Sequence, residues 1–238
     1  AVFTGEGALL SCGGDPRGEA GGGLEEGPRE ACDRLAWKAF RQGAFPEGEV
    51  RLPRLLQARL WQALATVPQF TICVANGSAM GDGLALVACT DYVVAMEGCF
   101  FSLADIKSGL VPAAMAPYVL AKTGTGVTKR LFCTCENLGA ATAVTEGLVD
   151  ETVPSLEEAD RLVRGLCERL TACGPRSVEA AKELVMGVAG QQIVEPLMFY
   201  TSMMAQRSLN SEEAHAASAA VAASRAKPWE ETPIKPLR

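Results

Sequence analysis

Two glycine-rich segments of this sequence could do chemistry through their backbone N–H groups. The first, Cys12-Gly13-Gly14-Asp15, comes shortly after an extended apolar stretch at residues 2–4. The second, residues 76–83, follows an apolar run and precedes a predicted helix. A helix start favours negative charge, and two N–H groups that converge on one point would form an oxyanion hole. Glycines in such turns also serve packing, so spacing alone leaves both interpretations open.

Other candidate groups favour ordinary structural roles. His215 is the single histidine and lies in an alanine-rich helix, so we expect it at the surface or at an interface. Cys133 and Cys135 form a CxC pair with no further ligands near it, and we therefore predict no metal site. The glycines at 124 and 126, with Lys129, lack the spacing of a phosphate-binding loop, so we interpret them as a turn between helices.

The composition is that of an ordinary globular protein and excludes several classes of function. The chain has 238 residues, of which 48% are hydrophobic and 21% charged, with a formal net charge of −6. The acidic balance argues against nucleic-acid binding, and no apolar run approaches the roughly 18 residues that span a bilayer. Nine cysteines without a CxxC pair predict buried free thiols in a reducing compartment rather than disulfides.

The elements that must position these groups alternate between strands and helices, which predicts an α/β fold. Short runs rich in β-branched residues predict buried strands at residues 70–74, 92–96 and 148–153, with a further extended piece at 100–101. Helical spacing predicts helices at residues 84–89, 112–122 and 139–146, and the first of these follows a turn at residues 76–83.

The C-terminal third is predicted to be helical. An apolar stripe marks a helix from residue 156 to 170, which Gly174-Pro175 ends; Ser177 is the expected cap of the next helix, and Ser211 starts the last one. We therefore divide the chain into a core at residues 1–155, a helical region at 156–228 and an extended tail at 229–238.

Five segments in order along the chain carry a family resemblance. Residues 3–15 (FTGEGALLSCGGD), 74–91 (VANGSAMGDGLALVACTD), 101–112 (FSLADIKSGLVP), 140–153 and 211–229 are similar to the successive signatures of the enoyl-CoA hydratase/isomerase (crotonase) superfamily. Each segment alone is a weak signal. Their order and spacing over almost the whole chain make the set specific.

The resemblance implies a fold, a substrate class and a set of site residues. The fold would be a β-β-α spiral core with a C-terminal helical region that assembles trimers of like or related subunits. The substrate would be an acyl-CoA thioester, with coenzyme A entering as part of the substrate and no separate cofactor. The oxyanion-hole donors would be the backbone N–H groups of Gly14 and Asp82. Coenzyme A would contact the residues Ser11, Cys12, Asp15, Arg225 and Lys227.

The sequence departs from the family pattern in three places. The two catalytic carboxylates of the hydratases belong at Ala85, which cannot titrate, and at Asp105, which is shorter than the usual glutamate. Asp105 could equally cap a turn near Ser108. Asp82 puts a carboxylate where the family has a small residue, and it either points into the pocket or away from it. We also expect the family's first strands, which usually precede the segment matching Ala1, to be missing here.

These features support two hypotheses of different kinds. The first is a crotonase-type acyl-CoA enzyme, for which the residues favour an isomerase over a hydratase, with Asp105 as the acid and base. The alternative is a catalytically degraded crotonase-fold subunit with a structural role in a larger assembly. Family habit places either protein in the mitochondrial matrix.

Overall fold

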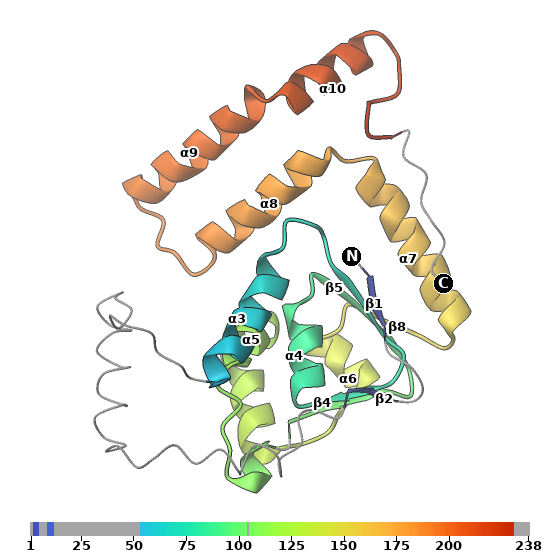
Figure 1. The fold of residues 1–238 in the computed structure, drawn as a ribbon, viewed down its shortest axis with the longest axis vertical. Coiled ribbons are helices and arrows are strands. Elements are labelled where there is room, and N and C mark those ends of the chain that lie inside the picture. Colours follow the sequence, from blue (N-terminus) through green and yellow to red (C-terminus); the bar gives the residue numbers. More distant parts are fainter. Residues whose placement is uncertain (1, 5–8, 12–52, 104, 231–238) are drawn as a thin grey trace.

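The strands form two four-stranded sheets, and from β1 to β6 successive strands alternate between them (Figure 1). The structure, a computed structural model, describes residues 2–4, 9–11, 53–103 and 105–230. Sheet A is entirely parallel and has the order β1 (Val2–Thr4), β3 (Ile72–Ala75), β5 (Tyr92–Met96) and β8 (Glu151–Val153). Sheet B has the order β2 (Leu9–Ser11), β4 (Ser78–Met80), β6 (Phe100–Ser102) and β7 (Leu138–Gly139), of which β7 alone runs antiparallel.

The path of the chain is a β-β-α spiral. A strand of sheet A is followed by a strand of sheet B and then by a helix, as in β3, β4 and α4 (Asp82–Cys89), or in β5, β6 and α5 (Ala116–Thr134). This confirms the predicted α/β fold of the crotonase type. Strands β3 and β5 are buried along most of their length because both lie inside sheet A, which explains their continuous apolar sequence.

The main core fills the space between the sheets and helices α3 (Pro53–Thr66), α4 and α5. Its members include Trp61, Leu84, Phe101, Leu103 and Val119, each at most 3% exposed. Helix α4 is short and apolar and contributes six buried residues. Its packing therefore fixes where its first turn lies relative to sheet B.

Between residues 76 and 147 one local prediction is wrong and two are confirmed. The turn predicted at residues 76–83 contains strand β4, which forms because it pairs with β2 and β6. Gly124 interrupts α5, as the predicted turn between helices requires: it adopts φ +73° and ψ 169°, and a second helical segment continues from this kink to Thr134. Helix α6 (Ala140–Thr145) and the left-handed Gly147 that follows it agree with the prediction.

Four helices form the C-terminal part. Helix α7 (Leu156–Thr171) packs against sheet A through Ala159, Val163 and Leu166. Helices α8 (Pro175–Val188), α9 (Glu195–Leu209) and α10 (Glu212–Ala222) contain no fully buried residue, and α9 and α10 lie outermost in Figure 1. Ser211 caps α10 as predicted by accepting a hydrogen bond from the Ala214 N–H.

The predicted cap at Ser177 is wrong. Helix α8 starts at Pro175 with Gly174 as its N-cap residue, so Ser177 lies inside the first turn. The side chain that accepts the N–H groups of this turn is Glu213 of α10, which binds Arg176 N at 2.9 Å and Ser177 N at 2.8 Å. A capping side chain that comes from another helix cannot be predicted from the sequence around the helix start.

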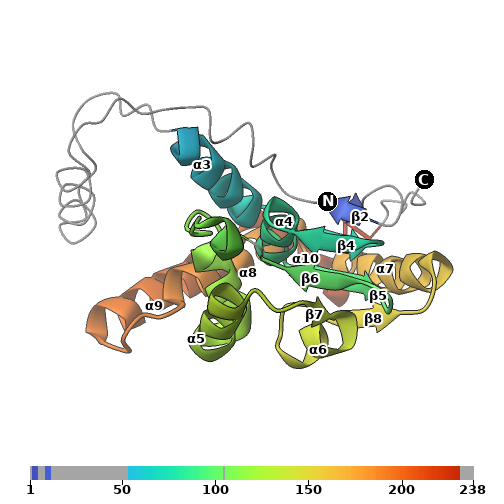
Figure 2. The same cartoon turned by 90° about the horizontal axis from the view of Figure 1, so that it is seen from below.

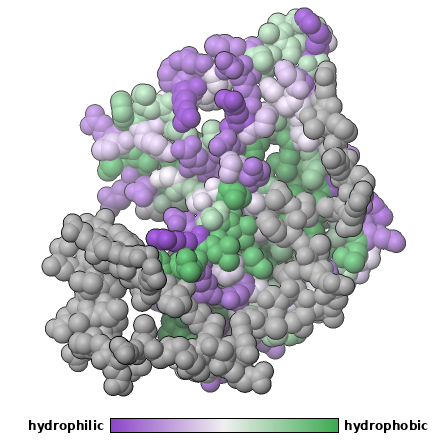
Figure 3. All heavy atoms as spheres, in the orientation of Figure 1, coloured by the Kyte–Doolittle hydropathy of each residue, from purple (hydrophilic) through white to green (hydrophobic). Residues whose placement is uncertain are grey.

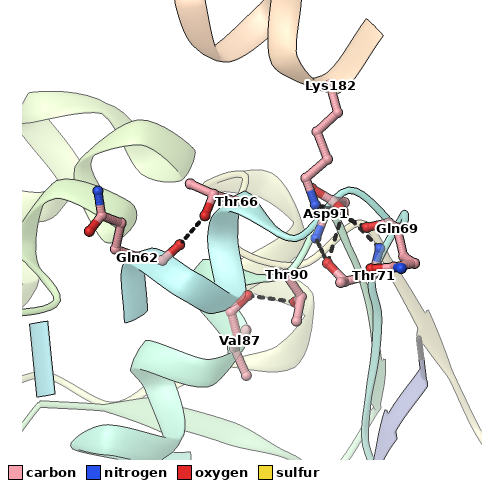
Figure 4. A network of polar contacts seen from close by, with 8 residues as sticks. All are labelled: Gln62, Thr66, Gln69, Thr71, Val87, Thr90, Asp91 and Lys182. Carbon is pink, nitrogen blue, oxygen red and sulfur yellow. Dashed lines mark hydrogen bonds and ion pairs between the residues drawn. The ribbon is translucent and has the colours of Figure 1, made fainter. Parts of the chain in front are cut away.

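A network of hydrogen bonds and one ion pair connects α8 to the core (Figure 4). Lys182 Nζ lies 2.6 Å from Asp91 Oδ2 and donates to the Gln69 carbonyl at 3.1 Å. The same Asp91 oxygen accepts from the backbone N–H and the hydroxyl of Thr71, at 2.7 and 2.8 Å. This carboxylate thus joins the start of β3, the end of α4 and the middle of α8.

Two further expectations concern membranes and thiols. Within the described ranges, no helix is both long and apolar enough to cross a lipid bilayer. The seven cysteines in this part of the chain are free thiols, of which four are buried. Cys133 and Cys173 are exposed, so the prediction that the thiols are buried holds for part of the set.

Candidate active site

Three parallel strands of sheet B end at one edge, and the segments of interest leave the sheet there. In β2 and β4, Ser11 is in register with Ala79; in β4 and β6, Met80 is in register with Ser102. Figure 2 shows β4 and β6 side by side. Because the carboxyl ends of parallel strands meet at the same edge, the residues that follow each strand gather there. Asp82 follows β4, and Asp105 follows β6.

The first turn of α4 begins at this edge with a glycine in an unusual conformation. Gly81 adopts φ +52°, which favours glycine, and its N–H donates to the Ser102 carbonyl at 3.1 Å. Leu84 and Ala85 donate to the Gly81 carbonyl at 3.0 and 3.2 Å. By helix geometry the amides of Asp82 and Gly83 have no acceptor inside α4, so this helix start can stabilise negative charge.

The side chain of Asp82 turns toward helix α3. Its Oδ1 accepts a hydrogen bond of 2.6 Å from Gln57 Nε2, and both residues are half-buried. The sequence left open whether this carboxylate points into a pocket or away from it. The structure shows a third arrangement, in which a neighbouring helix holds it.

Asp105 is the first residue of a short 3₁₀ helix, η1 (Asp105–Ser108), and is half-buried. Its backbone carbonyl accepts from the Leu110 N–H at 3.0 Å. Among the residues that the structure describes, none makes a hydrogen bond or ion pair with the Asp105 carboxylate. The capping role that the sequence left open therefore has no side-chain hydrogen bond in the described part of the chain.

Ala85 lies one turn into α4 and is 0% exposed. It packs in the main core with Leu84 and Val87. The position where the resemblance expects a first carboxylate is thus a small apolar contact, with no titratable group to hold or activate water.

The remaining predicted site residues are only partly placed. Cys12, Gly14 and Asp15 lie outside the described residues, and Ser11 ends strand β2 at the edge already defined. Arg225 is exposed, and Lys227 Nζ donates to the Ala172 carbonyl at 3.4 Å and pairs with Glu230 at 3.0 Å. Both follow α10, which is far from β4 in Figure 1, so one protomer does not bring them to Asp82.

The described residues contain no group of three or more His, Cys, Asp or Glu side chains that could hold a metal ion. Of the CxC pair, Cys133 is exposed and Cys135 is buried. His215 is exposed on α10, in agreement with a surface or interface role.

Sequence reasoning missed Gln57. It lies 25 positions before Asp82 on another helix, and no spacing rule links the two. Its contact exists because α3 packs along α4, with Trp61 buried one turn further on.

Comparison with known proteins decides the family. The sequence matches the enoyl-CoA hydratase/isomerase family over residues 47–232. The chain belongs to this family. Among curated family members, the chain is 26% identical over 125 residues to enoyl-CoA hydratase ACTT6 of Alternaria alternata, which covers 52% of this chain and 42% of that protein. It is 27% identical over 135 residues to a carnitinyl-CoA dehydratase of Shigella flexneri, which covers 55% and 50%.

The chain spans about half the length of these curated relatives. Solved structures extend the likeness in fold. An enoyl-CoA hydratase/isomerase from Marinobacter aquaeolei superposes with a TM-score of 0.78 at 21% identity, over 97% of this chain and 81% of that one. An enoyl-CoA hydratase from Shewanella pealeana gives 0.75 at 24% identity, over 96% and 77%.

Proposed function

We propose that this protein is an enoyl-CoA isomerase that stabilises a thioester enolate and uses Asp105 to move a proton. The observation that carries the proposal is the shared edge of sheet B. There a helix start that favours negative charge follows β4, and a half-buried carboxylate follows the adjacent strand β6. The relatives are named as hydratases and dehydratases. The proposal of an isomerase therefore rests on the residues of this chain and not on those names.

The chemistry needs one carboxylate and one anion site. Asp105 takes a proton from C2 of a 3-enoyl thioester, and the negative charge moves to the thioester oxygen. Backbone N–H groups, from Asp82 and, by the family resemblance, Gly14, hold that oxygen. Asp105 then returns the proton to C4, which leaves the 2-enoyl isomer with no net gain or loss of atoms. Water addition would need a second group to activate water, and Ala85 offers none.

The family resemblance also indicates which residues would bind the coenzyme A part of the substrate. Ser11 ends strand β2 at this edge, and we propose that Ser11, Cys12 and Asp15 contact coenzyme A. Arg225 and Lys227 would meet coenzyme A phosphates across a subunit boundary, because both follow α10 and, in its own protomer, Lys227 donates to Ala172 at the end of α7.

The test is isomerisation of a 3-enoyl-CoA, followed by the absorbance of the conjugated 2-enoyl product. Replacing Asp105 by Ala is expected to lower kcat by about 100-fold or more, since general acid–base catalysis contributes at least that much. The dissociation constant for acyl-CoA should change little. Glu97→Ala, which removes an exposed carboxylate after β5, is the matched control and should leave kcat unchanged.

Two results would contradict this proposal. One is equal activity in Asp105→Ala and the unsubstituted protein. The other is no binding of acyl-CoA by the unsubstituted protein at millimolar ligand. That second result would favour the catalytically degraded subunit, an alternative supported by the apolar Ala85 and the carboxylate at Asp82.

A further inference from the structure

The hydrogen bond between Gln57 and Asp82 links helix α3 to the first turn of α4 at the proposed anion site. Gln57 Nε2 donates to Asp82 Oδ1 at 2.6 Å, and Asp82 is the first residue of α4. Helix α3 is held against α4 by Trp61, which follows Gln57 by one turn and is 3% exposed. The donor is therefore presented by a packed helix rather than by a loop.

The electrostatics of this residue are unusual for an oxyanion site. The N–H of Asp82 attracts an enolate oxygen, whereas its own carboxylate repels one. The balance depends on where the carboxylate points and how its charge is compensated. An amide donor on α3 does both: it sets the direction of the side chain, and it places the positive end of an N–H dipole on the charged oxygen.

We propose that Gln57 is a positioning residue for the reaction, which holds the Asp82 carboxylate against α3 so that the start of α4 can stabilise an enolate. This inference rests on the proposed function. Gln57 acts through Asp82 and does not itself contact the reacting atoms. The role makes a side chain on α3 part of the active site.

Gln57→Leu is the direct test, because leucine fills similar space and removes the donor. We expect kcat for 3-enoyl-CoA isomerisation to fall about 10-fold, the size of one hydrogen bond to a charged group, with KM changed less than about threefold. Gln57→Glu keeps the shape but replaces the donor by an acceptor, and should lower kcat at least as far. Gln62→Leu, on the exposed side of the same helix, is the matched control.

A double-mutant cycle distinguishes positioning from a general effect on folding. In an Asp82→Ala background the carboxylate is gone, so adding Gln57→Leu should change kcat by a factor of about one. Thermal melting of every variant checks that the fold is intact.

The outcomes separate this inference from the function on which it rests. If the unsubstituted protein isomerises substrate and Gln57→Leu behaves like Gln62→Leu, the positioning role is overturned and the function stands. A fall in kcat that is equally large in the Asp82→Ala background also overturns it. If the unsubstituted protein neither binds acyl-CoA nor turns it over, the proposed function itself fails.

Discussion

At the scale of single residues, the thiols of this protein fall into two chemical groups. Burial raises the pKa of Cys73 and of Cys89 from 9.0 to about 12, although the nearby Lys122 ammonium opposes the shift in both. Thiolate is the reactive form, so these two thiols are almost fully protonated and shielded at neutral pH. Cys133 and Cys173 are exposed.

This difference predicts the pattern of alkylation. At pH 7.5 the folded protein should react with iodoacetamide at Cys133 and Cys173, while Cys73 and Cys89 stay unmodified until denaturant is added. Peptide mass spectrometry of native and denatured samples measures the four sites separately. Labelling of Cys73 at the rate of Cys133 in the native protein would contradict the burial of β3.

At the scale of elements, a largely buried ion pair connects helix α8 to the core. Lys182 is 11% exposed and Asp91 is 20% exposed, and the two charged atoms lie 2.6 Å apart. No residue of α8 is fully buried, in contrast to α7, which buries Ala159, Val163 and Leu166. The rest of the Asp91 network stays in place when the lysine is removed, which leaves a largely buried charge without its cation.

We therefore expect Lys182→Met to lower the free energy of unfolding by about 3 kcal/mol, the lower end for breaking a buried pair. Denaturant unfolding followed by circular dichroism measures the change. The control is Lys129→Met on the exposed surface of α5, for which less than about 0.5 kcal/mol is expected. A loss no larger than that of the control would mean that other contacts hold α8.

At the scale of the whole molecule, the C-terminal helices carry large apolar side chains that do not pack into the core and are exposed. Val185 and Met186 of α8 and Met198, Phe199 and Met203 of α9 are between 47% and 69% exposed. Both green and purple spheres cover the helical upper part of the face in Figure 3, so hydrophobic and hydrophilic residues are interspersed there. We propose that α8 and α9 bind further crotonase-fold subunits, in line with the trimer that the family resemblance implies.

Placing a charge on this apolar surface should break the assembly. Phe199 is 69% exposed, and Phe199→Glu is expected to shift the protein toward the monomer in size-exclusion chromatography with light scattering. Thr125→Glu, which adds the same charge at the exposed kink of α5, should leave the mass unchanged. A monomeric unsubstituted protein would contradict the proposed trimer.

Local patterns in the sequence determined the fold class, the family and many of the elements. The strand predicted at residues 92–96 is β5, and the apolar stripe from residue 156 is α7. Both could be predicted because a strand inside a sheet has a continuous apolar sequence, and a helix with one buried face has apolar residues at helical spacing. The order of segments such as residues 74–91 and 101–112 indicated the family, and the family match over residues 47–232 confirms it.

Only the tertiary structure decided the contacts between segments far apart in the chain. Strand β4 exists because β2 and β6 pair with it, the Glu213 cap of α8 comes from α10, and Asp82 is turned by Gln57 of α3. None of these has a local period or motif, because the energy of each comes from a partner that folding brings near. The sequence shows that Asp82 brings a negative charge close to the proposed anion site. The packing of α3 on α4 determines where that charge lies.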